Sequence, residues 1–132
     1  MSESAPGFAK HPQHQIDIEP IQQTARVTFA GEVIATTTHA LRLCESRYPP
    51  VIYIPFADCQ QALFVPSDTE TYCPFKGTAS YWTLQLTNPA DADSDKATDA
   101  VWGYKDPYSE VLPIKNLVAF YLSKFDIEIT LS

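Results

Sequence analysis

Short β-rich runs, bounded by prolines and other turn residues, constrain the fold of this chain more than any other feature. The runs are "QIDIEP", "ARVTFAGEVIATTTHALRL", "PPVIYIPF", "ASYWTLQLT", "AVWGY" and "LVAFYLSKFDIEITL", and they alternate in polarity or are rich in β-branched and aromatic residues. Prolines fall mostly between the runs, where they disturb a hydrogen-bonded ladder least. Many short strands at close spacing predict an all-β sandwich or barrel-like domain.

The length and the start of the chain predict one domain behind a flexible tail. A chain of 132 residues with 45% hydrophobic residues suits a single folded core. Residues 1–14 are small, polar and proline-containing, so we expect a tail there and one domain over residues 15–132. "HPQH" places His11 and His14 three positions apart, but no cysteine or acidic residue is near, so a solvated tail is favoured over a metal site.

Charge and missing motifs exclude several classes of function. Nine basic residues against sixteen acidic ones give a net charge of −7, which argues against nucleic-acid binding. We find no apolar run of membrane-spanning length, no secretion signal, no Gly-rich phosphate loop, no Cys-x-x-Cys pair and no Gly-x-Ser-x-Gly elbow. The three cysteines, at positions 44, 59 and 73, fit reduced thiols and a cytoplasmic location.

Turn and helix signals divide the chain further. Residues 30–32 predict a hairpin turn, "ADCQQALF" one or two helical turns, and "DPYSEVLPIKN" a turn with a short helix. "NPADADSDKATDA" lacks an apolar period and predicts an acidic loop.

The stretch "TETYCPFKGTASYW" predicts a hairpin with a cysteine at its turn. We expect residues 74–77 to form a four-residue loop, so that Cys73 pairs with Thr78. Alternation then gives one core-facing strip and one opposite strip. The core-facing strip would contain Thr71, Cys73, Thr78, Ser80 and Trp82, and the opposite strip Glu70, Tyr72, Ala79 and Tyr81.

Cys73 has two interpretations. Lys76 could reach over the turn and favour the thiolate, which would make Cys73 a nucleophile or a redox thiol. Alternatively, Cys73 is a small apolar filler and Lys76 faces water, which general burial statistics favour. A Cys-His pair would depend on His39, the histidine inside the predicted domain.

Glu45 and several aromatic residues are further candidates. Glu45 shares a strand face with two leucines, so it is either an acid, base or ligand anchor, or a solvated strand end paired with Arg47. Tyr53, Trp102 and Tyr104 could wall a small-molecule pocket or simply fill the core. The glycine between the last two predicts a bulge or a close backbone approach.

Five stretches carry a resemblance to a known family, and together they cover most of the chain after about residue 25. In chain order they are "RVTFAGEVIATTTHALRLCES", "YPPVIYIPFADC", "TYCPFKGTASYW", "VWGYKDPY" and "LVAFY". The chain resembles domain of unknown function 427, a family also labelled nucleotidyltransferase-like. The resemblance implies a small β-tent, Mss4-like two-sheet domain similar to methionine sulfoxide reductase B. Relatives of that architecture hold zinc on two Cys-x-x-Cys pairs, which are absent here, so we expect no metal. The loop over residues 91–99 looks like an insertion.

The family's shared polar and aromatic positions fall here on Glu45, Tyr53, Cys73, Lys76, Tyr81, Trp102 and Tyr104. Tyr81 conflicts with the predicted hairpin register, which places it opposite Cys73. The nucleotidyltransferase label finds no support, because no paired metal-binding carboxylates on a strand and no Gly-Ser phosphate motif are present.

We therefore expect a domain that binds a small molecule and that could act on it through Cys73, assisted by Lys76 or Glu45. Tyr53, Tyr81, Trp102 and Tyr104 would line the pocket, with no cofactor, no nucleic-acid partner and no membrane partner. The alternative is a protein-interaction module without chemistry. A redox enzyme, with Cys44 or Cys59 as resolving thiol, is a weaker option, and a homodimer is left open.

Overall fold

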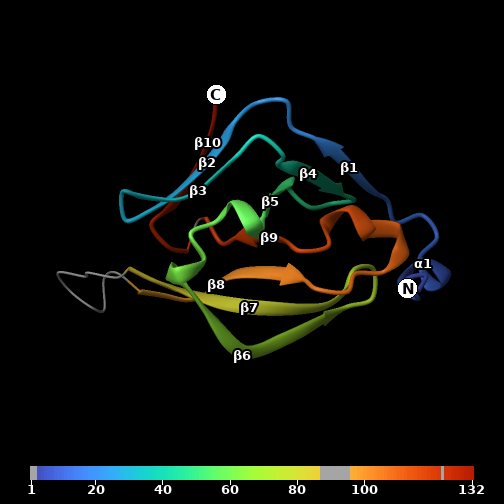
Figure 1. The fold of residues 1–132 in the computed structure, drawn as a ribbon. Helices are drawn as coiled ribbons and strands as arrows, with labels where there is room; N and C mark the ends of the chain where they lie inside the picture. The colour runs from blue at the N-terminus through green and yellow to red at the C-terminus, as the bar shows by residue number, and fades with distance from the viewer. Residues whose placement is uncertain (1–2, 87–95, 123) are drawn as a thin grey trace.

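Antiparallel strands form two sheets in the computed structural model, which describes residues 3–86, 96–122 and 124–132 (Figure 1). The larger sheet has seven strands in the order β1 (Ile16–Pro20), β4 (Leu41–Glu45), β5 (Val51–Pro55), β9 (Leu117–Phe120), β8 (Lys96–Tyr104), β7 (Gly77–Gln85) and β6 (Phe64–Cys73). The smaller has the order β10 (Ile127–Leu131), β2 (Ala25–Phe29) and β3 (Glu32–Thr37). The predicted all-β class with two sheets is confirmed; the β-tent assignment stays a prediction.

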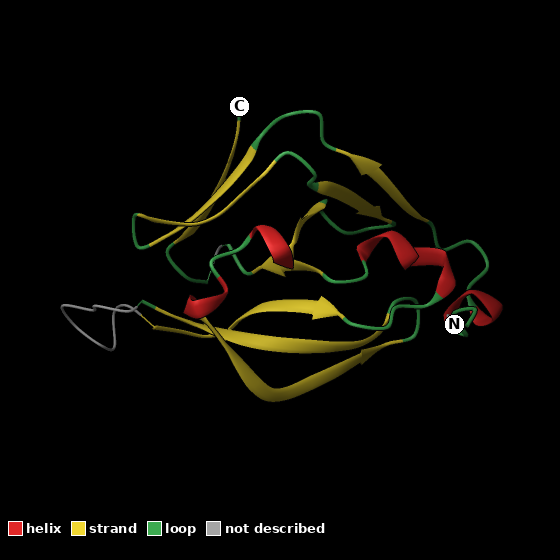
Figure 2. Cartoon of the chain, in the orientation of Figure 1, coloured by secondary structure: helices red, strands yellow, loops and turns green. Residues whose placement is uncertain are grey.

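Short helical segments connect the strands in the part of the chain that the structure describes (Figure 2). They are α1 (Gly7–Lys10), η1 (Phe56–Asp58), η2 (Gln61–Leu63) and η3 (Ser109–Ile114). The turns predicted in "ADCQQALF" and "DPYSEVLPIKN" are therefore confirmed. The predicted turn between β2 and β3 is confirmed at Ala30 and Gly31, whereas Glu32 is already the first residue of β3. Ala30 and Gly31 both have positive φ.

The predicted acidic loop is shorter than expected at its C-terminal end. β8 begins at Lys96, so residues 96–100 are strand, because they extend the ladder that β8 forms with β7. The remainder of the predicted insertion, up to residue 95, lies outside the described residues.

The seven-stranded sheet is strongly curved, with β1 and β4 at the top of Figure 1, β6 to β8 at the bottom, and β5 and β9 between them. One face packs against the small sheet and forms the large core, whose buried members include Val27, Ile34, Ile54, Trp82, Leu84, Val101, Val118 and Phe120. The other face lies inside the curve and forms the small core, which consists of Leu43, Tyr53, Ala79, Tyr104, Val111, Ile114 and Ala119. Below, the two sides of the sheet are the large-core face and the small-core face.

The predicted register of the β6–β7 hairpin is wrong by one residue. Cys73 pairs with Gly77 rather than Thr78, so the turn has three residues, and Lys76 N donates to Cys73 O at 3.2 Å. Gly77 adopts φ +119°, a conformation that suits glycine, and it does so as the first residue of β7. Because alternation has a period of two, the shift moves Tyr81 onto the same face as Cys73 and leaves Trp82 on the opposite face.

The N-terminal residues pack against this hairpin turn. Gly7 N donates to Pro74 O at 2.9 Å, and a Cβ on Gly7 would lie 2.8 Å from the Phe75 ring. Phe8 meets the Phe75 ring edge-on at 5.0 Å. The N-terminal residues also contact η3, where Ser109 N donates to the Glu3 carbonyl at 2.8 Å. The division into a flexible tail and a domain stays a prediction, but these contacts bring residues 3–14 beside the site described next.

Candidate functional site

An ion pair that is largely withdrawn from solvent lies at the centre of the candidate site. Lys76 Nζ is 2.6 Å from Glu45 Oε1, and the side chains are only 11% and 12% exposed. The second carboxylate oxygen, Oε2, lies 2.7 Å from Nε2 of His14, whose side chain is 15% exposed. Charges that are mostly removed from water need such partners, because desolvation is costly.

Three separate segments position these groups. Glu45 is the last residue of β4, and Lys76 lies in the β6–β7 turn. His14 precedes β1, which pairs with β4 so that Ile16 lies opposite Glu45. The imidazole stacks on the Phe75 ring at 3.9 Å with an interplanar angle of 19°, which fixes His14 over the carboxylate.

Cys73 extends this series of titratable groups. Its Sγ lies 3.9 Å from Lys76 Nζ, and Cys73 is partly exposed. Thiol, ammonium, carboxylate and imidazole therefore lie in sequence, each within contact distance of the next. A cation beside a sulfur favours the thiolate, which is the nucleophilic form.

Buried phenols adjoin the series. Tyr53 and Tyr104 are 1% and 7% exposed. Burial raises the pKa of both phenols, and the nearby charges of Glu45 and Cys73 raise the pKa values further. A hydrogen bond with the Trp102 side chain lowers the pKa of Tyr53 in part. Both phenols therefore stay protonated and can act as hydrogen-bond donors.

Tyr81 and Trp102 lie opposite each other on β7 and β8 and form the more accessible part of the site. The Tyr81 hydroxyl lies 3.0 Å from Thr71 Oγ1. Tyr121 stands 4.6 Å from the Trp102 ring, and its pKa is raised to about 12, first by burial and then by a hydrogen bond with Tyr81. This part of the site is aromatic with hydroxyl groups at its edge.

The structure brings all seven sequence-derived candidates onto the small-core face. They are Glu45, Tyr53, Cys73, Lys76, Tyr81, Trp102 and Tyr104. The conflict over Tyr81 disappears with the corrected hairpin register. Glu45 pairs with Lys76 and His14 rather than with Arg47, and His39 is exposed, with its backbone N–H bound to Thr37 Oγ1.

Sequence reasoning considered His14 only as part of a metal site in the tail and missed its contact with Glu45. A signal for it does exist, because His14, Ile16 and Ile18 are two residues apart and therefore fall on one face if the β1 pattern is extended backward. Thr71 and Tyr121 were also not singled out. Their contacts depend on the hairpin register and on the position of β9, which no local pattern specifies.

The other two cysteines differ from Cys73. Cys59 belongs to the large core, its thiol donates to Pro55 O at 3.5 Å, and burial together with the charge of Asp58 raises its pKa to about 12. Cys44 lies on β4 and, like the other two, is a free thiol. Cys59 is thus poorly placed as a resolving partner, because it and Cys73 pack on opposite faces of the large sheet.

A surface pocket of about 610 Å³ adjoins the ion pair. It is lined by Lys10, His11, Pro12, Gln13, His14, Ser46, Arg47, Tyr48 and Phe75. His14 borders this pocket and also contacts Glu45, so the imidazole connects the pocket with the ion pair. Within the described residues, no group of three or more His, Cys, Asp or Glu side chains is arranged to hold a metal ion.

The comparison with protein families matched most of the length of the chain. A family described as "Domain of unknown function (DUF427)" matches residues 17–130. The comparison with curated proteins gave no match.

Proposed function

The chain belongs to the DUF427 family, and we propose that in it the site around Cys73 binds a small molecule and presents Cys73 as a nucleophile. The observation that carries the proposal is the convergence of Cys73, Lys76 and Glu45, with Lys76 Nζ 3.9 Å from Sγ and 2.6 Å from Oε1. A protein-interaction module without chemistry would not need these groups to meet.

Each group has a role in the proposal. Lys76 stabilises the Cys73 thiolate, and Glu45 with His14 holds the ammonium in place. The thiolate adds to an electrophilic carbonyl carbon, the C=O electron pair moves to oxygen, and the Lys76 ammonium donates a hydrogen bond to that oxygen. Tyr53 and Tyr104 supply hydroxyl donors, and Tyr81 and Trp102 bind the body of the ligand.

Site-resolved alkylation tests the proposal without a known substrate. The chain is treated with iodoacetamide at neutral pH, and the rate at each cysteine is read from its peptide by mass spectrometry. We expect Lys76→Met to slow Cys73 by about tenfold through loss of the adjacent cation, and Lys76→Arg to restore most of the rate.

The control is Lys105→Met, which removes an exposed lysine directly after β8 and should leave the Cys73 rate unchanged. Circular dichroism confirms that each variant is folded under the assay conditions. An equal Cys73 rate in folded Lys76→Met and the parent chain would refute the assignment of Lys76 and favour a structural role for the ion pair.

The cellular location and assembly are part of the same proposal. Three free thiols support a cytoplasmic location, and a monomer or a homodimer can be distinguished by light scattering. In the part of the chain that the structure describes, each helix is too short or too polar to span a bilayer.

A further inference from the structure

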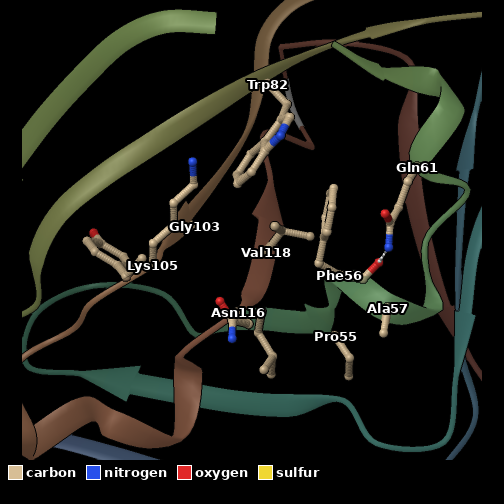
Figure 3. A pocket seen from close by; sticks show the side chains of 11 residues that line it. Pro55, Phe56, Ala57, Gln61, Trp82, Gly103, Lys105, Asn116 and Val118 are labelled. Carbon is tan, nitrogen blue, oxygen red and sulfur yellow. Dashed lines mark hydrogen bonds between the residues drawn. The ribbon is translucent and has the colours of Figure 1, made fainter. Parts of the chain in front are cut away.

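A second pocket, of about 670 Å³, opens on the large-core face of the seven-stranded sheet (Figure 3). Residues from β5, η1, β7, β8 and β9 line it, among them Phe56, Trp82, Gly103 and Val118. Its volume lies within the range of about 300–1,000 Å³ that is usual for small-molecule sites. This pocket lies on the other side of the sheet from the Cys73 site, because Trp82 and Val118 belong to the large core. Tyr104 is the residue of the Cys73 site that also lines this pocket.

The walls of this pocket are flat and apolar. Phe56 and Trp82 stack with ring centroids 5.2 Å apart and an interplanar angle of 28°. Next to them, Gly103 leaves the wall without a side chain, since a Cβ there would lie 2.7 Å from Leu117 O and 3.4 Å from Trp82 Cζ3. Flat rings beside bare backbone favour a flat ligand over a branched one.

The charge of the lining is unusual for this protein. The chain carries sixteen acidic and nine basic residues, yet the pocket lining contains a lysine, Lys105, and no aspartate or glutamate. Lys105 Nζ lies 5.8 Å from the centre of the Trp82 ring. Among the described residues no carboxylate comes within 4.0 Å of it, although Asp68 and Glu70 border a neighbouring pocket that Lys105 also lines.

Amide side chains complete the lining. Gln61 Nε2 donates to Phe56 O at 3.1 Å and so fixes one side of the pocket, as the dashed line in Figure 3 shows. Asn116 lies at another side, and its backbone carbonyl, not its side-chain amide, accepts a hydrogen bond from Phe56 N at 3.0 Å. The pocket thus combines aromatic walls, neutral amides and one cation.

We propose that this pocket binds an organic anion with a flat aromatic body, such as an aromatic carboxylate. The ring lies against Phe56 and Trp82, and the anionic group lies at Lys105. Charge complementarity carries this choice, because a cation without a carboxylate partner stands beside an aromatic wall in an otherwise acidic protein.

The test compares 1-naphthoate with 1-naphthalenemethanol, which has the same ring system and no charge. The two indole N–H signals of a ¹⁵N-labelled chain are followed by NMR and assigned with Trp102→Phe. We expect 1-naphthoate to shift the Trp82 signal and to bind more tightly than the alcohol. Lys105→Met should weaken naphthoate binding about fivefold, which is the effect of one exposed ion pair, and should leave the alcohol unaffected.

A matched pair of glutamine variants tests the role of charge at constant size. Gln61→Glu places a carboxylate in the lining, whereas Gln60→Glu makes the same change at the neighbouring residue, whose side-chain amide binds Val33 O outside the pocket. Only Gln61→Glu should weaken naphthoate binding. An unshifted Trp82 signal, equal binding of the alcohol, or equal effects of the two variants would each overturn the proposal.

Discussion

The two faces of the seven-stranded sheet differ in the burial and the pairing of their charged side chains. On the small-core face, Lys76 and Glu45 are almost withdrawn from water and are paired with each other. On the large-core face, Lys105 is exposed at the rim of an apolar pocket and has no described carboxylate within 4.0 Å. A buried pair of this kind contributes geometry to a site, whereas an exposed cation contributes attraction for an anion.

Adjacent residues on the same strands supply both faces. Tyr81 and Trp82 follow each other on β7 but belong to the small-core and large-core faces, and Trp102 and Gly103 do the same on β8. Gly103 confirms the close backbone approach predicted for it, because a Cβ would meet Leu117 O at 2.7 Å. The register of two strands therefore determines both sites at once.

The largest contrast between the faces is expected for their lysines. Lys76→Met leaves the Glu45 carboxylate without its cation in a largely buried place, so we expect the free energy of unfolding to fall by about 3 kcal/mol. Lys105→Met removes an exposed charge and should cost less than about 1 kcal/mol. Urea denaturation measures both. Equal losses of unfolding free energy in the two variants would contradict the view that Lys76 is part of a buried ion pair and Lys105 is not.

A smaller loss of stability is expected for changes in the N-terminal segment, which contacts the Cys73 site on the small-core face. His14→Ala loses the bond to Glu45 and the stack on Phe75, so we expect a loss of about 1–2 kcal/mol in the free energy of unfolding. His11→Ala is the control, because His11 is exposed and its ring is 6.3 Å from Phe75. Neither variant should move the Trp82 indole signal, and a shift only in His14→Ala would contradict the separation of the faces.

The smallest effect concerns the phenol of Tyr121. Burial and the hydrogen bond with Tyr81 raise its pKa to about 12, so Tyr81→Phe should lower that pKa toward the ordinary value of about 10. The Tyr121 phenol therefore stays protonated to a higher pH in the folded chain than in the unfolded chain. Its contribution to stability is therefore present below pH about 10 and is lost as the pH rises toward about 12.

Tyrosine-selective ¹³C labelling and NMR titration measure this pKa, with Tyr121→Phe to assign the signal. Tyr48→Phe serves as the control, because Tyr48 is 64% exposed. An unchanged Tyr121 midpoint in Tyr81→Phe would show that the hydrogen bond does not contribute.

Much of the fold could be predicted because strand signals are local. Alternating and β-branched runs located most strands, and residues 30–32 gave the β2–β3 turn. The register of the β6–β7 hairpin could not be predicted, because Gly77 fits equally as the last residue of the loop or as the first residue of the strand. That single choice decides whether Tyr81 or Trp82 lies beside Cys73.

The rest of the site depends on contacts between distant segments. β5 pairs with β9, and β1 pairs with β4, so residues far apart in the sequence meet at Glu45. The candidates Cys73, Lys76 and Glu45 could be selected by residue type and by resemblance to the family. The contact of His14 with Glu45 could not be predicted, because it requires the β1–β4 pairing and the Phe75 ring together.

The most direct test of a reactive thiol at Cys73 is its rate of reaction with iodoacetamide in the folded chain, relative to the same chain unfolded in urea at the same neutral pH. Peptide mapping follows Cys59 in the same samples as a buried thiol. We predict that folding accelerates alkylation of Cys73 and suppresses alkylation of Cys59. Suppression of both cysteines by folding would contradict the proposal and identify Cys73 as a packing residue.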